Sequence, residues 1–240
     1  GRLDSTNIVD PVAAAITSID FDHEQYLGHT LAAIAAEKAG VIRRAIPVVT
    51  GPLQPEAREV IESACATSGA DFIEADRGAR VESTSAEGRM SVRITTPVRD
   101  YGWVRLGLRG EHQIPNALVA VRLLEQLQRI VPVDAGAIRS GLRDVRWPGR
   151  LQMLEAPGGR RVLLDAAHNP AGARALAAYV RREFPESLPI VFGAMRDKDA
   201  ALMIETLLPV ASKMVMTEPA NPRARSAVEL AAIAGGLSPT

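Results

Sequence analysis

Short apolar runs alternate with helix-like spacing in the N-terminal part of the chain. Two runs have the length of buried strands, and the segments that follow them repeat their apolar residues about every 3.6 positions, as an amphipathic helix does. The pattern predicts strands at 14–17 and 47–50 and helices at 31–42 and 55–68. Thr30 is placed to cap the first helix, and Gly69 is placed to end the second. Strands that alternate with helices favour a parallel sheet covered by helices.

The pattern changes between residues 81 and 108, where apolar and polar residues alternate. Such alternation is typical of half-exposed antiparallel strands, which we expect at 91–95 and 103–108. A helix with Pro115 in its first turn follows at about 115–129, and a shorter helix at 135–142. The segment 147–150, Trp-Pro-Gly-Arg, has the composition of a linker and divides the chain.

After this linker, strand and helix patterns alternate again. Strands are predicted at 161–165, 189–193 and 213–217, and helices at 170–183, at 198–208 and from Ser226 onward. This order predicts a doubly wound parallel sheet, in which ligands bind at the carboxyl ends of the strands.

Composition narrows the classes of function that remain. The chain is 47% hydrophobic and 23% charged, as is usual for a soluble globular protein. Its 28 Lys and Arg balance 28 Asp and Glu, so bulk charge does not favour a nucleic-acid partner. A single cysteine excludes an internal disulfide framework and fits a reducing compartment. No apolar run approaches the roughly 18 residues of a membrane helix. We expect a monomeric cytoplasmic protein with no nucleic-acid or membrane partner.

Asp165, His168 and Asn169 lie where a predicted strand gives way to a helix. In a parallel sheet this point is the ligand crevice, and the free amides of the helix start favour an anionic group. A carboxylate and an imidazole three residues apart could hold a ribose, a metal-bound phosphate or a reacting carboxylate. The alternative is structural: Asn169 caps the helix, Pro170 fills its first position, and Asp165 is a polar strand end.

The equivalent strand end in the first part of the chain carries Asp20, Asp22 and His23. Two carboxylates close to an imidazole suit a hard cation such as Mg²⁺, which prefers oxygen ligands. The alternative is a solvated acidic loop, which these residues alone favour slightly over a metal site.

Lys38 has an unusual position for a lysine. Positions 34, 35, 38, 39 and 42 share one face of the predicted helix, so Lys38 lies on its apolar stripe. A buried ammonium group is unfavourable unless it is paired or neutralised. Asp22 or Glu24 could pair with it, a chemical change could remove its charge, or the side chain could extend to solvent at a helix end.

Further polar residues at element junctions could contact a nucleotide. The amides of Gln113 and Asn116, between a strand and a helix, could read an adenine edge, although helix capping also explains them. Arg150, beside the linker, could reach a phosphate as a bidentate donor. Asp197 is a candidate cap for the helix at 198–208. The sequence contains neither a Gly-x-x-x-x-Gly-Lys-[Ser/Thr] phosphate loop nor a Gly-x-Gly-x-x-Gly motif.

Taken together, these segments resemble the folylpolyglutamate synthase/dihydrofolate synthase family of the Mur ligase superfamily. The matches follow the family's order and include Gly-Arg-Leu-Asp-Ser-Thr-Asn at 1–7 and Asp-Ala-Ala-His-Asn-Pro at 165–170. The others lie at 16–19, 22–23, 26–28, 37–42, 110–113, 116, 147–151, 192–195 and 197–199. Asp20 and Ala166 stand where the family more often has glycine, and neither change removes a predicted ligand.

The resemblance implies an α/β fold with mainly parallel sheets in two domains. Residues 1–146 would be the remainder of a P-loop-type Mur ligase central domain, and residues 150–240 a Rossmann-like Mur ligase C-terminal domain. The family's phosphate loop, a magnesium-binding Glu, and its last strand and helix have no counterpart in the sequence. We therefore expect an N-terminally truncated chain that is also short at its end.

The resemblance also implies roles for individual residues. They are magnesium binding by His23, catalysis by Lys38 as a carbamylated lysine and by His168, pterin binding by Leu3, Asp4 and Ser5, and ATP binding by Asn116, Arg150 and Asp165.

The implied reaction is amide formation driven by ATP with Mg²⁺. The carboxylate of dihydropteroate or a folate attacks the γ-phosphate to give an acyl phosphate, and the amine of L-glutamate then displaces phosphate. We expect the 240-residue chain alone to have little or no activity. Two alternatives stay open: a Mur-type ligase of cell-wall synthesis, and a non-catalytic nucleotide-binding module.

Overall fold

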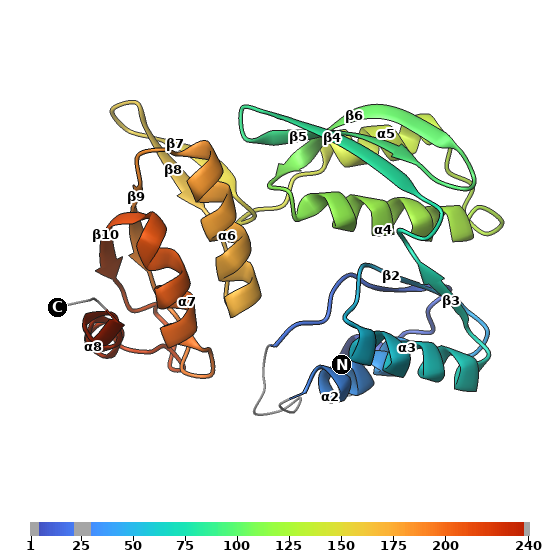
Figure 1. Cartoon of the computed structure of the whole chain (residues 1–240), viewed down its shortest axis with the longest axis horizontal. Coiled ribbons are helices and arrows are strands. Elements are labelled where there is room, and N and C mark those ends of the chain that lie inside the picture. The colour runs from blue at the N-terminus through green and yellow to red at the C-terminus, as the bar shows by residue number, and fades with distance from the viewer. Residues whose placement is uncertain (1–4, 22–29, 238–240) are drawn as a thin grey trace. The chain divides into compact units, whose positions relative to one another are not determined.

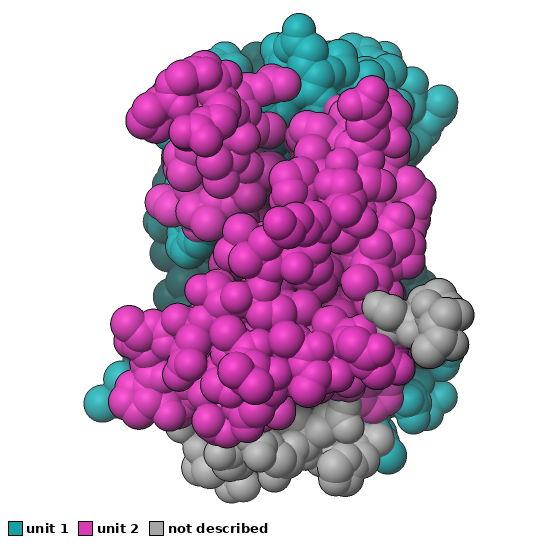
Figure 2. Space-filling model, turned by 90° about the vertical axis from the view of Figure 1, so that its left-hand side faces the viewer, with its two compact units in different colours: residues 1–20, 27–147 teal, residues 21–26, 148–240 magenta. Residues whose placement is uncertain are grey.

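The computed structural model describes residues 5–21 and 30–237 and divides into two compact units (Figures 1 and 2). Unit 1 comprises residues 1–20 and 27–147, and unit 2 comprises residues 21–26 and 148–240. The boundary between Trp147 and Pro148 falls inside the segment predicted to be a linker. Among the helices of the described ranges, none combines the length and the apolar character that crossing a membrane requires.

A three-stranded parallel sheet is the first layer of unit 1. It contains β1 (Ala14–Ile16), β2 (Pro47–Thr50) and β3 (Asp71–Glu74) in that order. Helices α2 (Leu31–Lys38) and α3 (Pro55–Ser68) cover one face, and α4 (Gln113–Gln126) covers the other (Figure 1). Successive residues of β2 serve the two faces: Val48 packs in the α2 and α3 core, Val49 packs with α4, and both are fully buried.

The strands predicted at 14–17 and 47–50 are confirmed, and so are both predicted helix ends. The Ala33 amide donates to Thr30 Oγ1 over 3.1 Å, and Gly69 ends α3 in the left-handed conformation with a φ of 61°. The first helix is shorter than predicted because the chain tightens into a 3-10 turn, η2 (Ala39–Val41), after Lys38. The sequence analysis missed β3, in which acidic residues flank a short apolar pair.

An antiparallel meander forms the second sheet of unit 1. It consists of β4 (Arg80–Ala86), β5 (Arg89–Thr95) and β6 (Asp100–Arg109), and α4 and α5 (Ala135–Asp144) pack against it. Glu87 and Gly88 both have positive φ in the two-residue turn that joins β4 to β5, as tight hairpins prefer. The predicted alternation is confirmed in β5, whereas the almost wholly polar β4 was missed. Helix α4 begins at Gln113, ahead of the start predicted at 115.

A buried ionic network connects α4 to the meander. The side chain of Glu125 on α4 is only 1% exposed. It accepts hydrogen bonds from Thr96 Oγ1 and, over 3.0 Å, from Tyr101 Oη, and it forms a 2.7 Å ion pair with Arg122 Nη1. The Nε of Arg122 is buried with no hydrogen-bond partner among the described residues. One cation and two hydroxyl groups therefore compensate a buried carboxylate that the sequence analysis did not identify.

Burial, together with the hydrogen bond to Glu125, raises the pKa of Tyr101 to about 12. In the unfolded chain the phenol of Tyr101 loses its proton near pH 10. The neutral phenol therefore stabilises the folded state in full only below that pH. We expect unit 1 to lose about 2–3 kcal/mol of stability as the pH rises from about 10 toward 12. Urea unfolding followed by the fluorescence of Trp103 and Trp147, both in unit 1, measures the loss. Tyr101→Phe should flatten the alkaline slope, and equal slopes in the two proteins would contradict the assignment.

Unit 2 alternates strands and helices in the predicted order. Its strands are β7 (Gln152–Ala156), β8 (Arg160–Leu164), β9 (Leu188–Phe192) and β10 (Ala211–Met216), and its helices are α6 (Pro170–Glu183), α7 (Ala200–Leu207), η3 (Leu208–Val210) and α8 (Ala227–Leu237). Side chains of β8, β9 and β10 share one core with α6, α7 and α8. β9 and β10 are parallel, as predicted. β8 differs from the prediction because it pairs antiparallel with β7, a strand that was missed.

Candidate functional site

The carboxyl ends of β1 and β2 are held side by side at one edge of the parallel sheet. The Gly51 amide donates to the Ile16 carbonyl over 2.9 Å. A Cβ atom at Gly51 would lie 2.2 Å from the Thr17 carbonyl oxygen, so this close approach requires glycine. Thr50 is fully buried, and its Oγ1 has no hydrogen-bond partner in the described part of the chain. Parallel α/β sheets bind ligands at this edge. The close approach of Gly51 fixes the point at which the segment toward Asp20 leaves the sheet.

Ser5 lies exposed at the start of a short 3-10 helix, η1 (Ser5–Ile8). An arginine after α2 holds this helix in place: Arg43 donates from Nη2 to the Asn7 carbonyl over 3.0 Å and from Nη1 to the Gly40 carbonyl over 2.6 Å. The segment that carries Ser5 is therefore anchored to the turn that follows α2. Its pterin-binding role stays a prediction.

The other residues predicted to bind pterin and Mg²⁺, Leu3, Asp4 and His23, lie outside the described residues. Within 5–21 and 30–237, no group of three or more His, Cys, Asp and Glu side chains gathers to hold a metal ion. Asp20 is the described member of the predicted magnesium-binding segment, and magnesium binding by His23 stays a prediction.

Lys38 is the last residue of α2 and is partly exposed. Ile34 and Ala35 on the same stripe are fully buried, so the predicted apolar stripe exists but Lys38 lies at its margin. Its ammonium group forms no hydrogen bond or ion pair with another described residue. A cation is favoured there because the carboxyl end of a helix carries partial negative charge. The geometry agrees with a lysine that extends to solvent, and its carbamylation stays a prediction.

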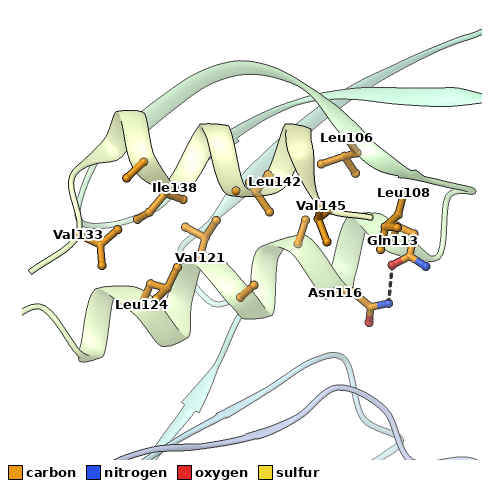
Figure 3. Close-up of a pocket in the computed structure, with 14 residues that line it drawn as sticks. Leu106, Leu108, Gln113, Asn116, Val121, Leu124, Val133, Ile138, Leu142 and Val145 are labelled. Atoms are coloured by element: carbon orange, nitrogen blue, oxygen red, sulfur yellow. Dashed lines mark hydrogen bonds between the residues drawn. The ribbon is translucent and has the colours of Figure 1, made fainter. Parts of the chain in front are cut away.

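Asn116 lies in the first turn of α4 and lines an apolar cavity. Its Nδ2 donates to Gln113 Oε1 over 3.1 Å, and Gln113 Nε2 lies 2.9 Å from His112 Nε2, so the two amides bond to each other and do not cap the helix. Figure 3 shows the amide pair at one end of the cavity, beside Leu108. The cavity, of about 320 Å³, lies between α4 and α5 among apolar side chains. Amides next to an apolar surface suit a planar heterocycle.

Asp165 follows β8 directly and holds two loops together. Its Oδ2 accepts the Leu151 amide and its Oδ1 accepts the Ala167 amide, both over 2.8 Å. The Ala166 amide donates to the Gly149 carbonyl over 2.7 Å and closes the same pair of loops. Leu151 is buried in the left-handed conformation with a φ of 44°, which is unfavourable by about 1–2 kcal/mol for a residue with a side chain. We call this arrangement, residues 149–151 joined to 165–168, the Asp165 clamp.

The Asp165 clamp carries Arg150 on one loop and His168 on the other. Both side chains are exposed. His168 Nδ1 lies 2.9 Å from the Ala166 carbonyl oxygen, which can only accept, so Nδ1 carries the proton in this contact. Nε2 of the neutral ring is then the nitrogen that can accept a proton.

The structural interpretation of Asn169 and Pro170 is confirmed. Asn169 Oδ1 accepts the Gly172 amide over 2.8 Å and caps α6, and Pro170 opens the helix. Asp165 also lies at the strand end, and its two hydrogen bonds to backbone amides are compatible with the structural interpretation, so its ATP-binding role stays a prediction.

The loops after β9 and β10 form a second polar cluster in unit 2. An isolated antiparallel bridge joins them at Met195 and Ala224. The side chain of Lys198 is 9% exposed and lies 3.7 Å from the Asp197 carboxylate. The predicted cap at Asp197 is wrong, because that carboxylate faces Lys198, and Asp199 caps α7 in its place. Lys198 was noted only as part of a strand-end loop and of the family match at 197–199, and no role was predicted for it.

The structure thus brings three predicted residues together, namely Arg150, Asp165 and His168 in unit 2. Asn116 and Lys38 lie in unit 1 on helices that cover opposite faces of the parallel sheet (Figure 1).

Comparison with known proteins gives matches along nearly the whole chain. Residues 149–239 match the family model described as "Mur ligase, glutamate ligase domain". The folylpolyglutamate synthase of Lacticaseibacillus casei is 34% identical over 230 residues, which cover 93% of this chain and 53% of that protein. The dihydrofolate synthase/folylpolyglutamate synthase of Bacillus subtilis is 36% identical over 236 residues, which cover 96% of this chain and 54% of that protein.

A solved structure is similar in fold as well as in sequence. It is the Mycobacterium tuberculosis folylpolyglutamate synthase complexed with ADP, with a TM-score of 0.90 and 36% identity. The match covers 98% of this chain and 53% of that one. The chain therefore spans about half the length of the relatives it matches.

Proposed function

Because the chain belongs to the folylpolyglutamate synthase/dihydrofolate synthase family, we propose that it carries part of the active site of a ligase that uses ATP and Mg²⁺. That ligase joins L-glutamate to dihydropteroate, to a folate, or to both. The Asp165 clamp carries the proposal, because it presents a carboxylate, a guanidinium and an imidazole at the start of α6. Residues 1–146 would belong to the Mur ligase central domain, and residues 150–240 would be the C-terminal domain.

The chemistry of the residues predicted to bind ATP, taken within each unit, supports an adenine nucleotide as the ligand. Each Asp165 oxygen keeps a second lone pair beyond the amide it accepts, so this carboxylate can accept the hydroxyl groups of a ribose. The exposed guanidinium of Arg150 can donate to phosphate oxygens. The Asn116 amide can both donate to and accept from an adenine edge. The ADP bound to the Mycobacterium tuberculosis relative supports a nucleotide as the ligand.

The proposed reaction makes one amide bond and breaks one phosphoanhydride bond. The acceptor carboxylate attacks the γ-phosphorus of ATP, ADP leaves, and an acyl phosphate remains. The amine of L-glutamate attacks the carbonyl carbon, and phosphate leaves with an oxygen atom that came from the carboxylate. Arg150 would stabilise the charge of the phosphoryl group, and Nε2 of His168 would accept the proton that the amine loses. Mg²⁺ would offset the negative charge of the nucleotide when it is bound.

The remaining roles rest on the family resemblance. Lys38 would be carbamylated, which its partly exposed position at a helix end permits. His23 would bind Mg²⁺, and Leu3, Asp4 and Ser5 would hold the pterin.

We also propose that the protein is a monomer and lies in the cytoplasm. The cytoplasm is a reducing compartment, which suits the free and buried thiol of Cys65. Burial raises the pKa of this thiol to about 11, as expected for a core residue.

A fusion protein tests the proposal. In it, this chain replaces the matching half of the Bacillus subtilis relative. We expect ADP release that requires both L-glutamate and an acceptor, either dihydropteroate or tetrahydrofolate. Mass spectrometry should find the acceptor glutamylated. The 240-residue chain alone should release ADP at least about a hundredfold more slowly, because its sequence contains no phosphate loop.

Variants and acceptors separate the possible outcomes of this experiment. Asp165→Ala in the fusion should slow ADP release at ATP concentrations below saturation, because it weakens nucleotide binding. A folded fusion that binds ATP but forms no amide with either acceptor would overturn the proposal. Amide formation only on a cell-wall nucleotide precursor would assign the chain to another Mur-type ligase.

A further inference from the structure

Four arginines line a pocket of about 450 Å³ in unit 1, and none of the predicted site residues that the structure describes is among its lining residues. They are Arg89 on β5, Arg105 on β6, and Arg143 and Arg146 at the end of α5 and just after it. We call it the arginine pocket. It adjoins the apolar cavity of Figure 3, and the two share Leu106 and Val145 as lining residues.

A close backbone approach forms the floor of the arginine pocket. A Cβ atom at Gly107 on β6 would lie 2.5 Å from the Val145 carbonyl oxygen and 2.6 Å from that of Arg143. Only glycine allows the strand and the end of α5 to lie this close. The Arg89 side chain binds at the same point of β6, where its Nη1 donates to the Gly107 carbonyl over 2.5 Å. The guanidinium of Arg89 is therefore held in position before any ligand binds.

The other arginines of the pocket are held to different degrees. Arg143 forms a bidentate pair with Asp144, with both N–O distances at 2.8 Å. Arg105 pairs with Glu87 over 2.8 Å, and that glutamate is 83% exposed. Arg146 forms no hydrogen bond and no ion pair with a described residue, and it acts on Asp144 only through its charge.

The charges of the arginine pocket do not balance. Its lining contains four guanidinium groups and a single carboxylate, and both oxygens of that carboxylate are already bound by Arg143. Clustered like charges repel one another, and an anion between them removes that repulsion. Guanidinium groups bind carboxylate and phosphate through two parallel hydrogen bonds, and the pocket is large enough for a small organic ligand.

We infer that the arginine pocket binds a small anion that carries two or more carboxylate or phosphate groups. Such an anion can come from two sources. One is the γ-linked glutamate tail of a folate, a source that rests on the proposed function. The other is a free polyphosphate, which does not depend on it.

Calorimetric titration of the chain with γ-linked tetraglutamate and, separately, with tripolyphosphate tests the inference. We expect saturable binding of at least one anion, weaker at about 300 mM than at about 50 mM salt because the arginines are partly exposed. Arg143→Ala with Arg146→Ala should weaken binding at least about tenfold. Arg146→Gln, which breaks no contact within the described structure, should weaken it about threefold.

The matched control is Arg44→Ala with Arg129→Ala, which removes the same charge from exposed residues that do not line the pocket. It should change the affinity less than about twofold. Binding of tetraglutamate alone would identify the glutamate tail, and binding of tripolyphosphate alone the phosphate source. No saturable binding of either anion, or equal losses in the pocket and control variants, would overturn the inference. These titrations need no turnover, so they are independent of the outcome of the fusion assay.

Discussion

Arg122→Met is expected to lower the free energy of unfolding of unit 1 by about 3–5 kcal/mol. The substitution removes the cation that pairs with Glu125 over 2.7 Å, and the carboxylate then stays buried with only the hydroxyl groups of Thr96 and Tyr101 as partners. Desolvation of an unpaired charge is the reason for the large effect. Urea unfolding followed by tryptophan fluorescence measures it, because both tryptophans lie in unit 1.

A second variant separates this mechanism from a simple loss of packing. Adding Glu125→Gln to Arg122→Met replaces the charge by a neutral amide of similar size, so the double variant should recover at least half of the loss. A loss below about 1 kcal/mol, or no recovery in the double variant, would show that the network is not what stabilises α4 on the meander.

Asp165→Ala should open the Asp165 clamp and weaken nucleotide binding at least about tenfold, which corresponds to about 1.4 kcal/mol. It leaves the amides of Leu151 and Ala167 without their acceptor and lowers the stability of unit 2 by about 2–4 kcal/mol. Hydrogen exchange at these two amides, measured by NMR, should accelerate first. Calorimetric titration with ADP, on the chain and on the fusion protein, measures the change in affinity.

Two further variants test the specificity of that result. Asp165→Asn keeps one acceptor oxygen, so one of the two amides should stay protected from exchange. Glu186→Ala removes an exposed carboxylate from the same unit and should change neither exchange nor affinity. Unchanged protection of Leu151 and Ala167 in Asp165→Ala would mean that the clamp does not depend on this carboxylate.

The sequence predicted those helices and strands whose ends are set by residues within the element or next to it. Helix α6 begins where the Asn169 cap and Pro170 place it, and α3 runs from Pro55 to the residue before Gly69. β2 was predicted because it is a short, mainly apolar run, and the structure buries Val48 and Val49 between two helix layers. In each case the signal lies within the element or next to it.

The missed strands are defined by their partners and not by their own residues. β4 is almost wholly polar and is a strand because β5 pairs with it along its full length. β7 pairs in the same way with β8, which explains why β8 is antiparallel where a parallel strand was predicted. Hydrogen bonds between distant segments leave no periodic trace in either segment alone.

The candidate site likewise combines residues that the local sequence predicted with contacts between segments that are distant in the sequence. Asp165 and His168 were predicted from their position at a strand end, but the clamp depends on Leu151, whose left-handed backbone no pattern indicates. Arg122 and Glu125 are spaced like an ordinary surface ion pair, and only the packing of the meander buries them. The residues of the arginine pocket come from three separate segments, so their convergence is visible only in the structure.

We propose that this chain takes part in amide formation through an acyl phosphate. Transfer of a heavy oxygen isotope from the acceptor to phosphate tests this proposal. The fusion protein is supplied with dihydropteroate labelled in its carboxylate, with ATP and with L-glutamate, and the phosphate released is analysed by mass spectrometry. We expect one labelled oxygen in phosphate for each amide bond formed. Release of unlabelled phosphate, or of phosphate without amide, would contradict it.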